Sequence, residues 1–277
     1  MMTTTFNNRT IVQVAFTLFA SLCSPAMAGV TTYPAPGGEA VVGGLYGDGQ
    51  RRASGHLRCA ERVFRGGLLL CNTQNAVVRN CFFRTQDDYI AIKGLAEMTR
   101  PCENIVVEDC EFWTDVANIF RIGYECETAG MRNITARNID VLHYSKDYRD
   151  PTHYWANAII WLQPNQNLLM ENCHFEKLRV RSSGEDIIML MAKPMRCSYG
   201  PFKDPEPGTL RNCSFQDIAV HGEEGSFRGL IYMLGDSEQH NVSGMSFERV
   251  TYFGQPVLQE SPCVEMGPFV SDVRFGQ

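Results

Sequence analysis

A short pattern that returns along most of the chain constrains the fold more than any other feature of the sequence. In its full form it reads Asn, apolar, any, apolar, any, Asn or Asp, Cys, any, Phe. The clearest copies are Asn75–Phe83, Asn104–Phe112, Asn133–Val141 and Asn167–Phe175, and shorter copies are Thr209–Phe215, Val242–Phe247 and Val270–Phe275. The ends of successive copies lie roughly 28 to 40 residues apart, which is within the range of solenoid repeats.

A second apolar run follows each of the first copies, and together the two runs predict the fold. The second runs are Tyr89–Lys93, Asn118–Gly123, Asn157–Leu162, Asp186–Met191 and Gly229–Leu234. Gly, Asn or Asp separates the runs, and none keeps a helical period. Leucine-rich repeats would need a Leu ladder and a helix per repeat, which are missing. We therefore predict an all-β, single-stranded right-handed parallel β-helix of about seven coils over 71–277, each strand pairing with its equivalent in the next coil.

The cysteines follow the repeat more than they follow a disulfide framework. Of eleven cysteines, the copies place Cys81, Cys110, Cys173 and Cys213 at one position, with Ile139 in the gap. A cysteine that alternates with Ile behaves as a small buried apolar residue, so we predict an interior rung of thiols. The remaining cysteines leave room for disulfides, and Cys102 with Cys126 is one candidate pair. No zinc-like spacing occurs, so we expect no metal and no cofactor.

The first 28 residues have the features of an export signal. Arg9 precedes an apolar stretch from Ile11 to Cys23, and the segment ends in Pro-Ala-Met-Ala at Ala28. The apolar stretch is shorter than the roughly 20 residues of a membrane-spanning helix. We therefore predict a signal peptide over 1–28, a secreted or periplasmic protein and no membrane span; an uncleaved anchor is the less favoured alternative.

The charge of the chain limits its partners. The formal net charge is −6 and no run of basic residues occurs. Nonspecific binding to nucleic acid needs clustered Lys and Arg, so we expect no nucleic-acid partner. A polysaccharide or oligosaccharide substrate suits this surface better, and we expect a monomer.

Two adjacent acids, Asp87 and Asp88, stand between Phe83 and the next apolar run. Glycosidic hydrolysis needs one carboxyl group that protonates the leaving oxygen and a second that activates water or attacks the sugar. Asp is also common in turns, where its side chain bonds to the local backbone. The pair is therefore a candidate for catalysis, with a structural role in a turn as the alternative.

The phrase around the pair resembles a known family. Asp-Asp-Tyr-Ile-Ala-Ile-Lys-Gly, from Asp87 to Gly94, is similar to a segment of glycoside hydrolase family 28, the polygalacturonases. Residues Asn104–Glu125 look more like relatives in family 49, the dextranases; both have the pectin-lyase-like β-helix. The resemblance implies an inverting hydrolase of a polysaccharide, in which Asp87 is the general acid and Asp88 positions or activates water.

The sequence also departs from these families. A third Asp is expected one coil before the pair, but Gly66 and Leu69 stand at the aligned positions, and the Gly-His-Gly and Arg-Ile-Lys motifs are missing. Three hypotheses therefore stay open: a hydrolase, with a complete or an incomplete site; a non-catalytic glycan-binding β-helix; and a polysaccharide lyase. A lyase would hold Ca²⁺ with acids such as Asp115 and use a base such as Arg121.

Other candidates for substrate binding lie near the pair. Arg121 alternates with apolar neighbours, so we expect it to point outward beside Lys93. Trp113, Asp115, Glu125 and His143 lie on or near the next two turns, where aromatic rings could stack on sugars and His143 could transfer protons. The alternatives are surface or packing roles, such as a solvated Arg121 and a packed Trp161.

The segment between the signal and the repeats is irregular. Residues 29–70 lack the pattern, and Thr32–Pro36 resembles the start of an N-terminal β-sandwich in related exported proteins. We interpret this segment as a truncated remnant of such a sandwich, left by a deletion or frameshift between Val42 and Leu70. Reading the nucleotide sequence in all frames would test this hypothesis.

Overall fold

The structure is a computed structural model, and within the residues it describes every regular element is a strand. It describes residues 67–85, 87–94, 100–114, 117–144, 157–181, 188–197, 204–221 and 230–277, and the backbone of two short strands before them. The strands are β1 (Thr32–Pro34), β2 (Ala40–Val42), β3 (Leu68–Cys71), β4 (Gln74–Arg79), β5 (Phe82–Phe83), β6 (Ile90–Lys93), β7 (Cys102–Thr114), β8 (Phe120–Gly123), β9 (Met131–Tyr144), β10 (Ile160–Gln163), β11 (Leu169–Arg181), β12 (Leu190–Ala192), β13 (Thr209–His221), β14 (Ile231–Met233), β15 (Val242–Tyr252), β16 (Gln255–Pro256), β17 (Val264–Met266) and β18 (Val270–Gly276).

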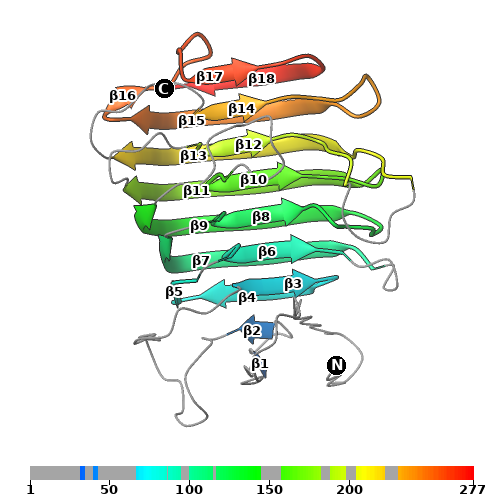
Figure 1. Cartoon of the computed structure of the whole chain (residues 1–277). Coiled ribbons are helices and arrows are strands. Elements are labelled where there is room, and N and C mark those ends of the chain that lie inside the picture. Colours follow the sequence, from blue (N-terminus) through cyan, green and yellow to red (C-terminus); the bar gives the residue numbers. More distant parts are fainter. Residues whose placement is uncertain are drawn as a thin grey trace, which may run out of the picture.

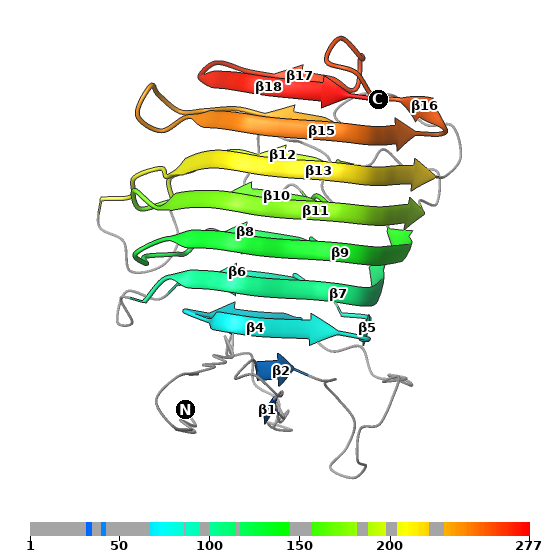
Figure 2. The same ribbon diagram turned by 180° about the vertical axis from the view of Figure 1, so that it is seen from behind.

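The strands form two sheets that share one interior. The short strands make a seven-stranded sheet in the order β17-β14-β12-β10-β8-β6-β3, seen from the front in Figure 1. The long strands belong to an eleven-stranded sheet that includes β4-β7-β9-β11-β13-β15, seen from the front in Figure 2. Equivalent strands of successive repeats pair in parallel. The predicted all-β architecture of parallel strands is therefore confirmed, while the closed β-helix, its handedness and its number of coils stay predictions.

The Asn residues of the repeat mark bends in the long strands. Asn104 and Asp109 in β7, and Asn133 and Asn138 in β9, have positive φ angles between 54° and 56°. Asn and Asp tolerate this left-handed conformation better than most residues. The side chains also form a ladder, because the Asn133 amide donates to Asn104 Oδ1 at 3.0 Å. The polar positions of the pattern are therefore explained by the backbone geometry that the coil requires.

The register between β9 and β11 corrects the alignment of the repeats. Ile139 pairs with Leu178, and Cys173 pairs with Ile134. Aligning Asn133–Val141 with Asn167–Phe175 was therefore wrong by five positions. The error has a structural cause: each long strand carries polar left-handed residues five positions apart, so a slip of five superimposes one bend on the other.

The cysteines consequently belong to two interior rungs and not to one. The first contains Cys110, Ile139 and Leu178, and the second contains Ile134, Cys173, Cys213 and Met245. The prediction of buried thiols on the long strands is confirmed. Cys102 and Cys126 are also buried thiols without a disulfide, so the candidate pair was wrong. Burial raises the pKa of Cys102 to about 12, which keeps this thiol protonated.

Stacked aromatic rings fill the interior beneath the long strands. Phe175, Phe215, Phe247 and Phe275 stack with centroid separations of 5.4, 4.9 and 4.6 Å and interplanar angles of at most 13°. Such pairs stabilise by about 0.5–1.5 kcal/mol beyond the burial of their area. The final aromatic residues of these copies therefore form one continuous stack, buried at Phe175, Phe215 and Phe247 and partly buried at Phe275.

The beginning of the chain is only partly within the described residues. Residues 1–28, where the signal peptide is predicted, lie outside them, as does most of 29–70. In that segment β1 pairs antiparallel with β2, and β2 pairs in parallel with β4. β3 begins at Leu68 and pairs with β6, so sheet pairing starts before the predicted boundary at residue 71. Within the described part of the chain, no helix is long and apolar enough to span a membrane.

Candidate active site

The acidic pair lies on a braced turn that leads into β6. Thr85 Oγ1 donates to the Asp87 carbonyl at 2.7 Å. The hydroxyl of Tyr89 lies 2.8 Å from the Thr85 carbonyl and 2.6 Å from the Trp113 carbonyl. The ring of Tyr89 is fully buried. Because this anchor reaches the next coil, the turn presents its carboxylates from a fixed backbone.

Asp88 is held by donors from the neighbouring strand. Its Oδ1 accepts hydrogen bonds from the Asn118 side-chain amide at 2.6 Å and from the Asn118 backbone amide at 3.3 Å. Asn118 Oδ1 in turn accepts from the backbone amide of Ala158 at 2.8 Å. This second bond fixes which end of the Asn118 amide faces Asp88. Asp88 is therefore oriented through a chain of bonds that crosses three coils.

Arg121 faces the other oxygen of Asp88. Its Nη1 lies 3.5 Å from Asp88 Oδ2, and both side chains are largely buried, with 11% and 12% of their surface exposed. The guanidinium carbon lies 4.8 Å from the ring centroid of Tyr124 and 4.9 Å from that of Trp161. Aromatic faces attract a guanidinium and more strongly when it is desolvated. The two rings thus hold a cation against Asp88, and Arg121 Nε has no hydrogen-bond partner among the described residues.

The structure changes what was expected of Arg121. Its neighbour in β6 is Ala91 and not Lys93. The residue is 9% exposed, so a solvated Arg121 is wrong. The physical reason is that the buried rings of Tyr124 and Trp161 cover the guanidinium and keep solvent from it. A packed Trp161 is confirmed, and its ring additionally contacts the cation.

Asp87 differs from Asp88 in its surroundings. Its Oδ1 accepts a hydrogen bond from the Asp88 backbone amide at 2.8 Å, and the residue is exposed at the surface. Surrounding protein atoms nevertheless displace part of its solvent, and this burial, followed by the negative charge of Asp88, raises the pKa of the Asp87 carboxyl. The hydrogen bond from the Asp88 backbone amide and the nearby charges of Lys93 and Arg121 lower the pKa but do not compensate. The raised pKa makes Asp87 a candidate proton donor.

Lys93 and Glu125 form an ion pair beside the acids. Lys93 Nζ donates to Glu125 Oε2, and their side chains are 15% and 27% exposed. Burial lowers the pKa of Lys93. The charge of Glu125, the hydrogen bond to Glu125 and the charge of Asp88 raise it by more, so the pKa of Lys93 is raised overall. Lys93 therefore stays charged and contributes positive potential at the acidic pair.

Trp113 and His143 form a second group at the ends of β7 and β9. Their ring centroids are 4.9 Å apart, and the Arg84 guanidinium carbon lies 5.4 Å from the Trp113 centroid. Trp113 is 36% exposed, so its ring is available to a ligand. The hydrogen bond between Tyr89 and the Trp113 carbonyl connects this group to the turn of the acids. Asp115 lies outside the described residues.

Of the two positions where a third acid was expected, the structure describes one. Leu69 is half-buried in β3 and pairs with Ala91, whereas Gly66 lies outside the described residues. The described part of the chain contains no group of three or more His, Cys, Asp and Glu side chains that could hold a metal ion.

Sequence reasoning missed Asn118 as a site residue. Ile90 pairs with Phe120, so Asn118 occupies in the next coil the position that Asp88 has in its own. Aligning Asp-Tyr-Ile with Asn-Ile-Phe would have found it. The role of Tyr124 had no comparable signal, because it depends on a ring meeting a guanidinium across a bend.

Comparison with known proteins identifies the fold. No protein-family model and no curated protein matches the sequence. The crystal structure of a hyperthermoactive exopolygalacturonase from Thermotoga maritima is similar, with a TM-score of 0.52 and 18% identity over 76% of this chain and 44% of that one. The chain thus spans less than half the length of that protein. Identity this low shows a shared fold of stacked parallel β-strands and nothing finer.

Proposed function

We propose that the protein is an exported glycoside hydrolase that cleaves a polysaccharide with inversion at the anomeric carbon. The observation that carries this proposal is the unequal pair of carboxyl groups. Asp88 accepts bonds from Asn118 and faces Arg121, which suits a charged base, while Asp87 has a raised pKa, which suits an acid. Paired carboxyl groups in different environments are the usual arrangement for acid and base roles in glycosidases.

The reaction follows from these two roles. Asp87 gives its proton to the glycosidic oxygen as the bond from that oxygen to the anomeric carbon breaks. Asp88 accepts a proton from water as the water oxygen bonds to the same carbon from the opposite side. One water is consumed, and the protons redistribute through solvent after the products leave. Asn118 and Arg121 hold the Asp88 carboxylate in place during the reaction.

The first substrate to test is polygalacturonate. The structural neighbour is an exopolygalacturonase, and polygalacturonate is the polymer that its name gives as substrate. Dextran is the second substrate, because of the likeness of residues 104–125 to the dextranases. The exposed Trp113 offers a face on which a sugar ring can stack.

The decisive measurement is the release of reducing ends from polygalacturonate and dextran. Asp87→Asn and Asp88→Asn should each lower release at least 100-fold, because each removes one half of the acid–base pair. Glu111→Gln, which changes an exposed carboxylate on β7, should keep wild-type activity. NMR of the first product should show the inverted anomer. Release that is equal in wild type and Asp87→Asn would rule out the proposed mechanism.

One observation favours a second candidate function, a β-helix that binds glycan without cleaving it. Leu69 lies next to Ala91 where a third acid was expected, so a carboxylate is missing from the strand before the pair. This candidate predicts binding of the polysaccharide with no release of reducing ends. Binding would then persist in the Asp87→Asn and Asp88→Asn variants.

The export of the protein is a separate part of the proposal and has its own test. The features of Met1–Ala28 predict cleavage before Gly29. N-terminal sequencing of protein collected outside the cytoplasmic membrane should begin at or near Gly29. Size-exclusion chromatography with light scattering should show a monomer.

A further inference from the structure

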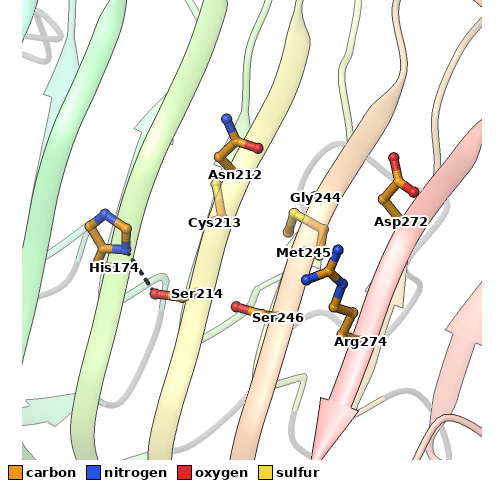
Figure 3. A pocket seen from close by; sticks show the side chains of 9 residues that line it. All are labelled: His174, Asn212, Cys213, Ser214, Gly244, Met245, Ser246, Asp272 and Arg274. Carbon is orange, nitrogen blue, oxygen red and sulfur yellow. Dashed lines mark hydrogen bonds between the residues drawn. The ribbon is translucent and has the colours of Figure 1, made fainter.

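A row of polar side chains crosses the outer face of the long-strand sheet. His174 in β11 pairs with Ser214 in β13, Ser214 with Ser246 in β15, and Ser246 with Arg274 in β18. Residues in register on adjacent parallel strands point the same way at intervals of about 4.8 Å. Figure 3 shows the four side chains side by side, with a larger group at each end and the two serines between them.

The short serines leave a hollow, which we call the serine trough. It has a volume of about 280 Å³ and is also lined by Asn212, Gly244 and Asp272. Gly244 has a φ of +69°, and a Cβ there would lie 2.6 Å from Asn212 Oδ1. Glycine therefore lets the Asn212 side chain lie close to this wall of the trough. Pockets for drug-sized ligands span roughly 300–1,000 Å³, so the trough suits a single small ring.

The chemistry of the trough favours a ligand with one carboxylate and several hydroxyl groups. His174 Nδ1 and Ser214 Oγ are hydrogen-bonded at 2.7 Å, and Ser246 adds a second hydroxyl. Arg274 forms no ion pair among the described residues, whereas Arg249 on β15 is bound to Asp217 at 2.6 Å. A guanidinium without a carboxylate partner can bind a planar carboxylate through two hydrogen bonds. Asp272 also lines the hollow, and its negative charge disfavours phosphate and other multiply charged anions.

We propose that the serine trough binds one uronate residue of an acidic polysaccharide. The carboxylate lies on Arg274, and ring hydroxyls bond to Ser214, Ser246 and His174. The choice of a sugar among hydroxylated monocarboxylates rests on the proposed function. The trough is on the long-strand sheet, whereas Asp87 and Asp88 precede β6 of the short-strand sheet. It would therefore hold the polymer at a place separate from the cleaved bond.

The test is a titration with trigalacturonate, followed by NMR of the labelled histidine rings. The Asp87→Asn chain is used so that the ligand is not cleaved, and the signal of His174 is identified by its loss in His174→Gln. The signal should shift on titration, and Arg274→Gln should weaken the affinity at least tenfold. Arg211→Gln, an exposed charge change on β13 outside the trough, should change it less than twofold. Methyl-esterified trigalacturonate should bind as weakly as trigalacturonate binds the Arg274 variant.

The outcomes separate this site from the catalytic proposal. A His174 signal that does not move, or an affinity that Arg274→Gln or esterification leaves unchanged, would overturn the trough. Ser246→Trp fills the hollow from an outward position and should abolish the shift while the melting temperature stays within a few degrees. If wild type releases no sugar but the Arg274-dependent shift is present, the hydrolase proposal fails and the binding site stands.

Discussion

At the scale of single residues, Asp87 and Asp88 are neighbours in sequence but have different surroundings, because their contacts come from different coils. Asp88 reaches Asn118 and Arg121, while the side chain of Asp87 accepts only from the Asp88 backbone amide in the described structure. The rings of Tyr124 and Trp161 act on Asp88 through Arg121 and are positioning residues. The division of labour is therefore a property of the coil stack and not of the Asp-Asp dipeptide.

The raised pKa of Asp87 predicts that Asp87→Asn increases the stability of the folded protein by an amount that depends on pH. The folded protein favours the protonated carboxyl, so this group stabilises fully below its unfolded pKa near 3.8 and loses that contribution as pH rises through the folded pKa. The variant keeps an oxygen for the Asp88 amide and has no charge to desolvate. Thermal melts should show the variant more stable at pH 7, with the difference closing toward pH about 3. A variant less stable than wild type at pH 7 would contradict this reading.

At the scale of elements, the position of one strand beside the next decides which residues meet. Arg179 in β11 bonds to both carboxylate oxygens of Asp140 in β9, at 2.6 and 2.7 Å. This contact exists only in the observed register. With the five-residue slip, Asp140 would lie beside His174.

A double-mutant cycle on Asp140→Ala and Arg179→Ala measures that register in solution. The two side chains are 36% and 41% exposed, so solvent screens the pair and a coupling of about 0.2–1 kcal/mol is expected. The hydrogen bond from Arg179 lowers the pKa of Asp140, so the coupling should be present at neutral pH and disappear as pH falls through that pKa. A cycle of Asp140→Ala with His174→Ala is the control and should show no coupling. Coupling to His174 in place of Arg179 would show that the register is wrong.

At the scale of the whole molecule, each repeat packs against the repeats above and below it. The stability of stacked repeats is approximately the sum of the repeats and their nearest-neighbour interfaces. Phe215 stacks on Phe175 below and on Phe247 above, so it belongs to two such interfaces. Substitutions at this ring should therefore affect more than the local strand.

Phe215→Ala is expected to lower the free energy of unfolding by about 3–5 kcal/mol, because it removes a fully buried ring and leaves a cavity. Phe269→Ala, at a ring that is 43% exposed, is the matched control and should cost much less. Denaturant unfolding followed by tryptophan fluorescence and circular dichroism would measure both. A similar loss in the two variants would show that the phenylalanine stack is not central to stability.

The amino-acid sequence by itself determined the architecture and the place of the acidic pair. The repeat is written in residues that each obey a local rule: Asn at left-handed bends, alternating apolar residues inside, and a turn before β6. Each of these rules depends only on residues a few positions apart, so it can be recognised in the amino-acid sequence itself. The presence of parallel strands and of buried thiols followed from them.

Only the tertiary structure decided the register and the partners of the acids. Each long strand has two bends five residues apart, so an alignment that is shifted by five residues fits the sequence pattern equally well. The pairing of Leu178 with Ile139 in the structure shows which alignment is correct. Arg121 became a buried cation because Trp161, from the next coil, covers it, and Asn118 became the donor to Asp88 because it lies one strand away. Contacts between coils depend on residues that are roughly 30 to 40 positions apart, and no local rule links them.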